Sequence, residues 1–418
     1  MSASQNRTRL TPVALLNFRD WRIGPKLLTA FLSAALIPLI LSGILSFRTS
    51  RDALLTQGIN NLTARSLSTS TAIDQFLESH KEDVGSYMTL PPLATFVANR
   101  GDATALNNAQ RVLPSLTNRK YYESVDIADV NGIVILSTTD KDLSANVKSF
   151  DYFQAALKGT NYISNPWIDG ETNRASLYAS APVLDPGGHI LGVLVSRISL
   201  DGVWDLVDSD LGAVGAGTVG MLLDENGMRI ALSESRGRRV GVDKLLYTAI
   251  APVPDATTKQ LVAEKRFGNV KSIGVTPVSE IAAALANPSA TTFETGADDS
   301  AVRHYAVISS LRNKPWHYVL MTPLPTFTGP ADSLAVEFFV LVLVVAAFTF
   351  VAVFFIARGF TTPIVQLTQV ADRISMGEMD IKIGIDRKDE IGQLAEAIGR
   401  MQASLQTAME RLRSRRTS

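Results

Sequence analysis

The sequence predicts an α+β protein with two antiparallel sheets on one long helix, two membrane-spanning helices, and a helical bundle after the second span. Three observations support this prediction. Residues 27–47 and 338–357 contain no Asp, Glu, Lys or Arg. An Asp-x-Asn-Gly turn between apolar runs occurs at residues 129–132 and again at 224–227. From residue 364 onward, apolar side chains recur at alternating spacings of three and four residues.

Composition narrows the class of protein. The 418 residues suffice for two or three domains, and a hydrophobic content of 46% is too high for a disordered chain. Forty Lys and Arg balance forty Asp and Glu, which excludes nucleic-acid binding through bulk positive charge. Because the chain has no Cys, disulfides, thiol nucleophiles, zinc-thiolate sites and iron–sulfur clusters are excluded.

The two uncharged segments are long enough to cross about 30 Å of hydrocarbon as helices. We therefore predict membrane spans at residues 27–47 and 338–357, the alternative being helices buried in a soluble core. A cleaved signal peptide is the competing interpretation of the first segment. It is disfavoured because 26 residues precede the segment and no small-residue cleavage site follows it.

Charge asymmetry sets the predicted orientation in the membrane. Residues 1–26 carry five Lys or Arg and one Asp, and residues 358–418 carry ten Lys or Arg and eight Asp or Glu. Residues 48–337 hold the remaining 25 basic and 31 acidic residues, a net charge of −6. By the positive-inside rule, both termini are cytoplasmic and the large loop lies outside the inner (plasma) membrane.

The external loop begins with a predicted stalk helix from Arg51 to about Val84, because its apolar residues follow a helical period. The repeated Asn-Gly hairpin predicts an internal duplication, with a distal module at about 85–210 and a proximal module at about 211–330. Residues 236–300 show no clear pattern. Further elements are predicted as a helix at 151–157 and strands near 162 and at 176–182, 191–198, 303–311 and 316–321.

The external loop contains five motifs: the Asp-x-Asn-Gly hairpin, DYFQAALKG at 151–159, YIS at 162–164, PWID at 166–169 and GVLV at 192–195. Together they resemble the double Cache sensor domain of bacterial transmembrane receptors. The resemblance covers about residues 48–330. It implies two PAS-like modules on one stalk helix, with a small-molecule ligand bound in the distal module.

The resemblance also implies positions for the ligand. Amino-acid-binding members carry an Arg before a Trp-Tyr pair, then an aromatic-x-Asp motif and an Asp on a late strand. In this chain Ser149 stands at the expected Arg and Arg197 at the late Asp. These differences remove an acceptor for an ammonium group, so a carboxylate or another small anion is favoured over an α-amino acid. The predicted ligand-binding residues are Tyr152, Phe153, Trp167, Asp169, Tyr178 and Arg197.

Two interpretations of these residues stay open. Arg197 either contacts a ligand anion or pairs with Asp126, Asp169 or another acidic residue inside the fold, since an unpaired buried charge is costly. The aromatic residues are either ligand contacts or ordinary core residues. Asp169 either binds ligand or, with Arg174, organises a turn around Gly170.

Residues 358–412 resemble a HAMP domain. Pro363 opens one predicted helix, and an extended connector from Gly377 leads to a second helix that starts at an acidic-Glu-Ile-Gly motif. Each helix has an apolar seam that needs partner helices, which predicts a parallel four-helix bundle in a homodimer. The predicted relay residues are Pro363, Ile364, Leu367, Gly377, Met379, Ile383, Glu390, Ile391, Gly392 and Leu394.

The sequence shows no nucleophile motif, phosphate-binding loop or His pair with metal-ligand spacing, so we predict no catalysis, no cofactor and no metal. After HAMP only a basic tail at 413–418 remains. We therefore predict a homodimeric membrane receptor that binds a small solute outside and signals to a separate cytoplasmic kinase, cyclase or phosphatase. The alternatives are the sensory part of a larger histidine kinase, nucleotide cyclase or chemoreceptor, or a solute-capture protein serving a transporter.

Overall fold

The computed structural model describes residues 21, 23–169, 174–233, 245–287, 292–296 and 302–416, with side chains up to residue 409. The chain divides into two compact units, which are described separately. Asp52–Gly329 is called the sheet unit, and Met1–Arg51 with Pro330–Ser418 is called the helical unit. One helix, α1 (Ile23–Tyr87), contributes to both.

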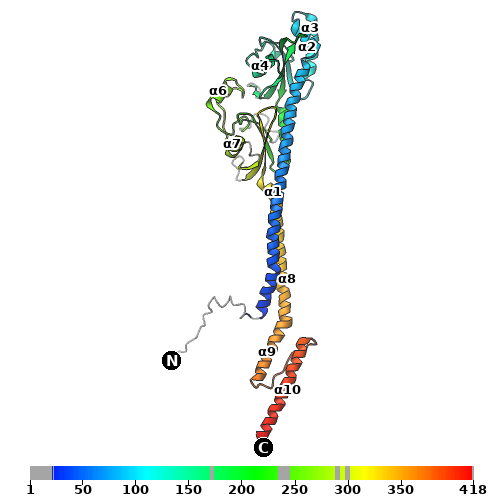
Figure 1. Cartoon of the computed structure of the whole chain (residues 1–418), viewed down its shortest axis with the longest axis vertical. Coiled ribbons are helices and arrows are strands. Elements are labelled where there is room, and N and C mark those ends of the chain that lie inside the picture. The colour runs from blue at the N-terminus through cyan, green and yellow to red at the C-terminus, as the bar shows by residue number, and fades with distance from the viewer. Residues whose placement is uncertain are drawn as a thin grey trace, which may run out of the picture. The chain divides into compact units, whose positions relative to one another are not determined.

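The sheet unit contains two separate antiparallel sheets, and its mixed helix and sheet content matches the predicted α+β class (Figure 1). The first sheet has the strand order β2-β1-β6-β5-β3, and β4 also pairs with β5. Its strands are β1 (Tyr122–Asp129), β2 (Val134–Ser137), β3 (Tyr162–Ile163), β4 (Trp167–Ile168), β5 (Ala175–Leu184) and β6 (Ile190–Ser199).

Helices cover both faces of this first sheet. Val125 and Ile127 of β1 point into a core shared with α1 and α2, whereas Ala128 packs with Phe153 of α4 on the opposite face. The predicted helix at 151–157 is confirmed, but α2 and α3 were not predicted. The helices around this sheet are α2 (Pro91–Ala98), α3 (Ala103–Val112) and α4 (Asp151–Leu157), with 3₁₀ turns at Leu113–Thr117 and Asp140–Asp142. The next helix, α5 (Asp201–Asp208), follows β6 and packs on the second sheet.

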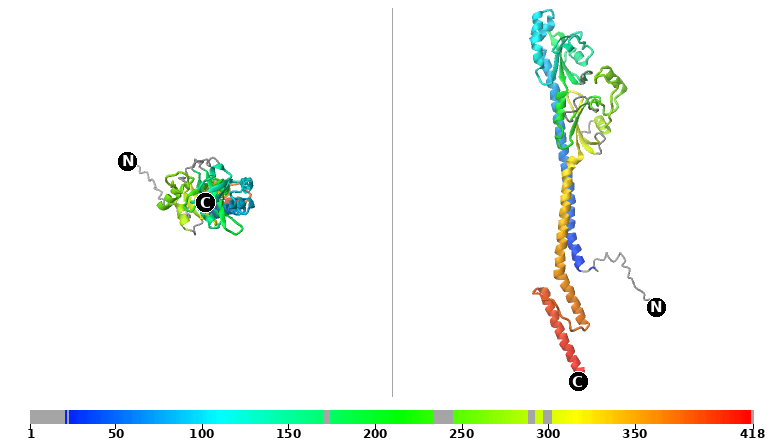
Figure 2. Two further views of the ribbon diagram at one scale, coloured as in Figure 1. Left: turned by 90° about the horizontal axis from the view of Figure 1, so that it is seen from above. Right: turned by 180° about the vertical axis from the view of Figure 1, so that it is seen from behind.

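The second sheet has the strand order β8-β7-β11-β10-β9. One face packs on α1, and the other carries α7, while α6 lies on the same side (Figures 1 and 2). Part of the segment that showed no clear pattern in sequence therefore forms two helices and an edge strand. The elements are β7 (Val219–Leu223), β8 (Arg229–Leu232), α6 (Asp255–Ala263), α7 (Ser279–Ala286), β9 (Thr292–Gly296), β10 (Arg303–Ser310) and β11 (His317–Pro323).

The two Asp-x-Asn-Gly turns make the same hydrogen bonds. Asp129 Oδ1 accepts from the backbone N–H groups of residues 131 and 133, both at 2.9 Å. Asp224 Oδ1 accepts from those of residues 226 and 228, at 2.8 and 2.9 Å. Gly132 and Gly227 have φ of +88° and +72°, which glycine adopts without a steric penalty. The predicted hairpins at both positions are confirmed.

Buried polar groups on α1 fix the second sheet against it. The Asp210 carboxylate, fully buried, accepts hydrogen bonds from Thr69 of α1 at 2.7 Å and from the Tyr318 hydroxyl at 2.6 Å. Asp74 of α1 accepts from the backbone N–H groups of Arg312 and Asn313, at 2.8 and 3.0 Å, in the β10–β11 turn. A buried carboxylate that lost these donors would be strongly destabilising, so the helix register is fixed.

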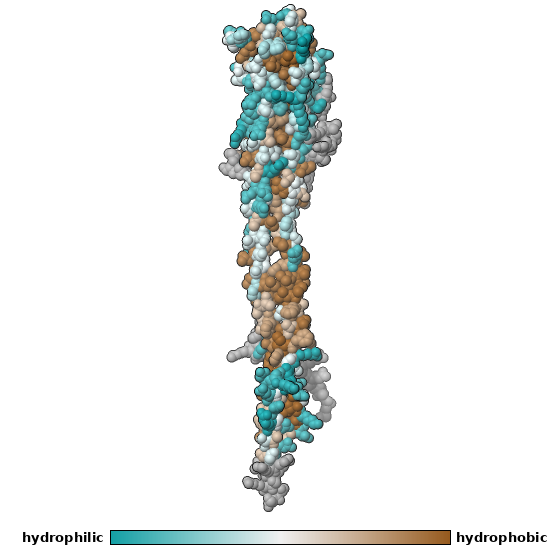
Figure 3. Space-filling model, turned by 90° about the vertical axis from the view of Figure 1, so that its right-hand side faces the viewer, coloured by the Kyte–Doolittle hydropathy of each residue, from teal (hydrophilic) through white to brown (hydrophobic). Residues whose placement is uncertain are grey.

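In the helical unit, two helices are long and apolar enough to cross a membrane, by length and composition. They lie within Ile23–Tyr87 and Leu324–Ser375, and they include both predicted spans. The apolar side chains over these segments gather on the surface (Figure 3), where hydrocarbon would cover them. Gly43 packs directly on the Phe338 ring, since a Cβ atom there would clash with it.

The second of these helices continues further than predicted. α8 (Leu324–Ile356) passes through a π-helical turn, Ala357–Thr361, into α9 (Thr362–Ser375). Pro363 was expected to open a separate helix, but it lies in the first turn of α9 without a break in the chain of helices. A wide π-helical turn accommodates a proline, which lacks the N–H that a regular turn would use.

After α9, an extended connector leads to α10 (Glu390–Arg416). Leu367, Ile391 and Ala395 are buried, and Ile383 of the connector packs against them. The Gln402 side-chain amide donates to the carbonyl oxygens of Met379 and Ile381 at 2.8 and 3.0 Å, which holds the connector along α10.

Gly392 gives a test of this packing. A Cβ atom at residue 392 would clash with the backbone carbonyl of Arg387, whereas a Cβ atom at Gly384 meets nothing within 4 Å. Overpacking of this kind costs about 1–3 kcal/mol, so Gly392→Ala should detach the connector. We expect trypsin to cleave after Arg387 and Lys388 several times faster in Gly392→Ala than in the wild type, and Gly384→Ala to match the wild type. Equal cleavage rates in all three proteins would contradict this packing.

Candidate ligand cavity

A cavity of about 620 Å³ opens at the end of the first sheet where β1, β4, β5 and β6 meet. Four of the predicted ligand-binding residues, Trp167, Asp169, Tyr178 and Arg197, line it. The volume suits a small solute. The other lining residues are Tyr121, Tyr122, Glu123, Lys141, Arg174, Ser176, Ser199 and Asp201.

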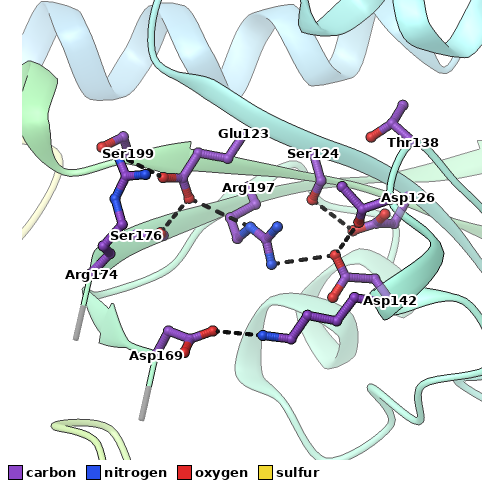
Figure 4. A network of polar contacts seen from close by, with 12 residues as sticks. Glu123, Ser124, Asp126, Thr138, Asp142, Asp169, Arg174, Ser176, Arg197 and Ser199 are labelled. Carbon is purple, nitrogen blue, oxygen red and sulfur yellow. Dashed lines mark hydrogen bonds and ion pairs between the residues drawn. The ribbon is translucent and has the colours of Figure 1, made fainter. Parts of the chain in front are cut away.

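Arg197 projects from β6 into the centre of this site (Figure 4). Its Nε lies 3.5 Å from Glu123 Oε2 and its Nη1 lies 3.3 Å from Asp142 Oδ2, and the side chain is 20% exposed. Among the described residues, these are its ion pairs within 4.0 Å. Burial lowers the pKa of Arg197, but the carboxylates of Asp142 and Glu123 more than compensate, so the pKa is raised and the guanidinium stays charged.

Arg197 pairs with two other acidic residues of the fold, Glu123 and Asp142, and not with Asp126 or Asp169, the two that the sequence analysis named. Asp169 does not pair with Arg197; its carboxylate lies 3.2 Å from the Lys141 ammonium group. Asp126 attracts Arg197 electrostatically without forming an ion pair. Both of the ion pairs of Arg197 are longer than the 2.7–2.9 Å typical of charge-assisted hydrogen bonds. The two carboxylates therefore neutralise the guanidinium at a distance, and the Tyr178 hydroxyl interacts with it as well.

Glu123 links most of the polar groups in the cavity. It accepts a 2.6 Å hydrogen bond from the Ser176 hydroxyl, and Arg174 Nη2 lies 3.8 Å from it (Figure 4). Arg174 also lies 3.7 Å from Asp201. Three cationic and three acidic side chains thus line the cavity and form a network of ion pairs and hydrogen bonds.

An aromatic stack forms one side of the site. Trp167 meets Phe150 edge-on at 5.0 Å, Phe150 stacks on Tyr152 at 5.3 Å, and Tyr152 stacks on Tyr178 at 4.9 Å. Trp167 and Tyr178 face the cavity. Burial raises the pKa of the Tyr178 hydroxyl, and the charge of Arg197 opposes that rise.

Two predicted ligand contacts do not reach the cavity. Tyr152 is 3% exposed and supports Tyr178 from behind, and its backbone carbonyl accepts from Ser180 at 2.6 Å. Phe153 is fully buried in the core between α4 and the sheet. The helix that carries both residues turns these side chains into the core because it packs flat on the sheet, and the core interpretation of this pair is the one that the structure supports.

Sequence reasoning missed the other lining residues. Ser176 and Ser199 could have been found, because each lies two residues from a predicted site residue on the same strand and therefore on the same face. Tyr121, Tyr122 and Glu123 gave no such signal, since they start a strand whose partner in the sheet comes some seventy residues later in the chain.

Asp126 lies behind Arg197 and is buried. Its carboxylate accepts hydrogen bonds from the hydroxyls of Ser137 at 2.5 Å and Ser124 at 3.1 Å. Burial, reinforced by the nearby negative charge of Asp142, raises the pKa of Asp126 to about 6 against the donations of the two serines. A group of three His, Asp or Glu side chains arranged to hold a metal ion is not found among the described residues.

The predicted relay residues lie in the buried core of the segment, in the connector, at the helix starts and on the exposed surface. Leu367 and Ile391 are buried, Met379 and Ile383 are half-buried in the connector, and Gly377 has a φ of +94° at its start. Pro363 and Glu390 lie in the first turns of α9 and α10, and Gly392 contacts the connector backbone. Ile364 and Leu394 are 40% and 46% exposed, which leaves apolar surface uncovered in one chain.

The described residues thus contain two helices apolar enough to span a membrane, a solute-sized cavity in the sheet unit, and a helix–connector–helix segment after the second of those helices. The Cache domain family matches residues 49–331, and the HAMP domain family matches residues 355–407. Because the first match covers more than half of the chain, the protein belongs to the Cache domain family. A Cache sensor followed by HAMP indicates a transmembrane sensory receptor with a periplasmic sensor domain.

Two solved structures similar to part of this chain are a histidine kinase sensor domain and a chemoreceptor ligand-binding domain. The sensor domain of the Vibrio cholerae histidine kinase DctB has 13% identity and a TM-score of 0.50, covering 65% of this chain and 98% of that one. The ligand-binding domain of the Campylobacter jejuni chemoreceptor Tlp3, in complex with 4-methylisoleucine, has 16% identity and a TM-score of 0.45, covering 66% and 94%.

One relative matches over a short segment. A protein of Acetivibrio thermocellus whose name describes a sensory transducer is 40% identical over 47 residues, which is 11% of this chain and 8% of the relative. The chain thus spans less than a tenth of the length of that relative.

The pKa of Asp126 predicts a pH-dependent stability. Its folded pKa of about 6 exceeds the ordinary 3.8, so its contribution is most favourable below pH 4 and is lost as the pH rises through 6. At pH 7.5, Asp126→Asn should therefore stabilise the receptor by about 2 kcal/mol, from the relieved burial cost less about one lost hydrogen bond. Urea unfolding of the purified receptor between pH 4 and 8 should show this gain vanish between about pH 4 and 5, because the burial cost disappears as Asp126 is protonated while the cost of the lost hydrogen bond remains.

Asp185 provides the opposite control. Its pKa is lowered by hydrogen bonds from His189, so Asp185→Asn should be destabilising above pH 4 and neutral below it. If the stability gained by Asp126→Asn did not vary with pH, burial of the charged Asp126 carboxylate could not be its cause.

Proposed function

We propose that the receptor binds a small carboxylate-bearing solute in this cavity, with Arg197 as the principal contact. The observation that carries the proposal is a charged, largely buried guanidinium in a solute-sized cavity whose own ion pairs are 3.3 and 3.5 Å long. A ligand carboxylate could form shorter, bidentate hydrogen bonds with it. Trp167 and Tyr178 would cover the apolar part of the solute, and Ser176 and Ser199 would serve its remaining polar atoms.

The charge balance of the cavity favours a second candidate, a zwitterionic solute. Asp169 and Asp201 line the cavity together with Glu123, and a ligand ammonium group could take these acceptors while the carboxylate takes Arg197. Both candidates share the carboxylate, and they differ in whether a positive charge at the other end of the solute adds affinity.

Four solutes of equal chain length separate these possibilities: butyrate, succinate, 4-aminobutyrate and putrescine. We expect the first three to raise the midpoint of thermal unfolding of the purified receptor, because ligands that bind the folded state stabilise it, and putrescine to leave it unchanged. Stabilisation by 4-aminobutyrate alone would favour the zwitterion. Stabilisation by putrescine alone would contradict a carboxylate site.

Substitution of Arg197 tests its role directly. For the solute that binds best in the series, Arg197→Gln should weaken binding at least about 30-fold, the value of one charged hydrogen bond of roughly 2 kcal/mol. Arg197→Lys keeps the charge but not the planar fork and should lose about tenfold. Arg303→Gln removes an exposed arginine of the second sheet, paired with Glu294, and should bind like the wild type by titration calorimetry. An affinity within twofold of wild type for Arg197→Gln would remove Arg197 from the site.

We further propose a homodimer with both termini in the cytoplasm, signalling through the relay residues to a separate kinase, cyclase or phosphatase. The exposed apolar seam of α10, Leu394, Met401 and Leu405, supports this proposal because it needs a partner helix. The alternative, the sensory part of a larger kinase, cyclase or chemoreceptor, is distinguished by the reading frame after residue 418.

The absence of Cys from the chain makes the dimer testable in membranes. A parallel bundle brings the two copies of Leu405 together, so Leu405→Cys should form a disulfide-linked dimer when cells are treated with a mild oxidant. Thr407, two residues further on, lies on a different face of the helix, and Thr407→Cys should remain largely monomeric. Equal cross-linking at both positions, or none at either, would contradict the proposed bundle.

A further inference from the structure

We propose that Tyr121 and Tyr122 transmit occupancy of the cavity to α1. The proposal rests on the proposed function of this cavity, since it concerns what an occupant does there. Both tyrosines line the cavity, and both also contact α1 directly. They join the solute site to the helix that runs through the sheet unit.

Tyr122 is held on α1 by two interactions. Its hydroxyl donates to Asp83 Oδ2 at 3.1 Å, and its ring stacks on the His80 imidazole with centroids 5.2 Å apart. Burial lowers the pKa of His80, so this contact is a stack of neutral rings near pH 7. Arg119, close in sequence, forms an ion pair with the same Asp83 and reinforces the attachment.

Tyr121 makes the neighbouring attachment. Its ring meets the Phe76 ring edge-on, with centroids 5.8 Å apart, and its hydroxyl donates to Asp205 of α5 at 2.7 Å. Gly202 of α5 permits this approach, because a Cβ atom there would clash with the Phe76 ring. Phe76, His80 and Asp83 are spaced by four and three residues, so the two tyrosines contact one face of α1 over two turns.

The backbone at this point is strained. Tyr121 has a φ of +74°, a left-handed conformation that costs a residue with a side chain about 1 kcal/mol or more. The Tyr121 carbonyl oxygen accepts a 2.7 Å hydrogen bond from the N–H of Ser199, which itself lines the cavity. The strained conformation of Tyr121 is thus held by the hydrogen bond from Ser199 in the cavity and by the ring contact with Phe76 of α1.

A ligand carboxylate bound to Arg197 would displace Glu123. A ligand carboxylate that takes hydrogen bonds from Arg197 competes with Glu123, whose 3.5 Å contact is the longer of the two ion pairs. Glu123 follows Tyr122 directly in the chain, so its movement changes the start of β1 and with it both rings. A coupling of a few kcal/mol is of the size that ligand-driven equilibria use.

The experiment uses a tethered occupant, so that it does not depend on knowing the natural solute. In the full-length receptor in lipid nanodiscs, Ser199→Cys is the sole cysteine and is alkylated with iodoacetate, which places a carboxylate in the cavity. Iodoacetamide gives the uncharged control of nearly the same size. Hydrogen exchange of peptides from β1 and from residues 72–84 of α1 is then measured by mass spectrometry.

We expect the carboxymethyl group to change exchange in both β1 and the α1 segment by about threefold or more relative to the iodoacetamide control. With Tyr121→Leu and Tyr122→Leu added, which remove both rings and both hydroxyls, the response of β1 should remain and that of α1 should fall to the control level. Tyr162→Leu, the matched change at a tyrosine bonded to Asp151 outside the cavity, should leave both responses intact.

An α1 response that persists in the double variant overturns the proposal, and so does an α1 segment that fails to respond, whether or not β1 responds. Failure of the proposed function has a different signature. It appears as the absence of binding by the free four-carbon solutes, which the tethered group does not require.

Discussion

The sheet unit depends on the polar character of the buried face of α1. Ser66, Thr69, Ser70, Asp74 and His80 are each less than a tenth exposed. A buried polar group without a partner costs roughly 1–3 kcal/mol, and Ser66, Thr69 and Asp74 find their partners outside the helix, at Ser309, Asp210 and the β10–β11 turn. An apolar helix could slide or rotate at little cost, whereas this one is fixed in register by Asp210, the β10–β11 turn and the stack on Tyr122.

The same rule governs the cavity. Arg197 is buried on a central strand and stays charged because Glu123 and Asp142 lie within 4 Å, yet neither pairing is short. The two carboxylates keep the guanidinium charged without forming short hydrogen bonds to it, so a ligand carboxylate that formed such bonds would gain binding free energy. Under the proposed function, the ligand would replace an internal partner of Arg197 instead of filling an empty space. The binding step would then have a mechanical consequence, since the displaced residue, Glu123, belongs to the strand that contacts α1.

Much of this arrangement could be predicted from local sequence patterns. The Asn-Gly turns, the helix at 151–157 and the two uncharged segments each depend on residues close together in the chain, and the structure confirms all of them. Arg197, Trp167 and Asp169 were placed at the cavity by resemblance. Tyr152 and Phe153 show the limit of that method, because a motif does not reveal which side of a helix faces the core.

The remaining site residues could not be predicted because their positions depend on pairings between distant strands. Glu123 meets Arg197 only because β1 pairs with β6, and Asp142 reaches the same group from a 3₁₀ turn beyond β2. Similarly, the continuous path from α8 to α9 depends on a π-helical turn, for which the sequence gives no signal beyond Pro363 itself.

The central claim is that a carboxylate-bearing solute occupies the cavity on Arg197. The most direct measurement is a crystal structure of Asp52–Gly329, the compact sheet unit, grown with the tightest-binding of the four-carbon solutes. The account predicts density for the solute between Trp167 and Arg197, with its carboxylate in hydrogen-bonding contact with the guanidinium and Glu123 moved away from it. Solute bound on the second sheet, or in the cavity with the Arg197–Glu123 contact unchanged, would contradict the account.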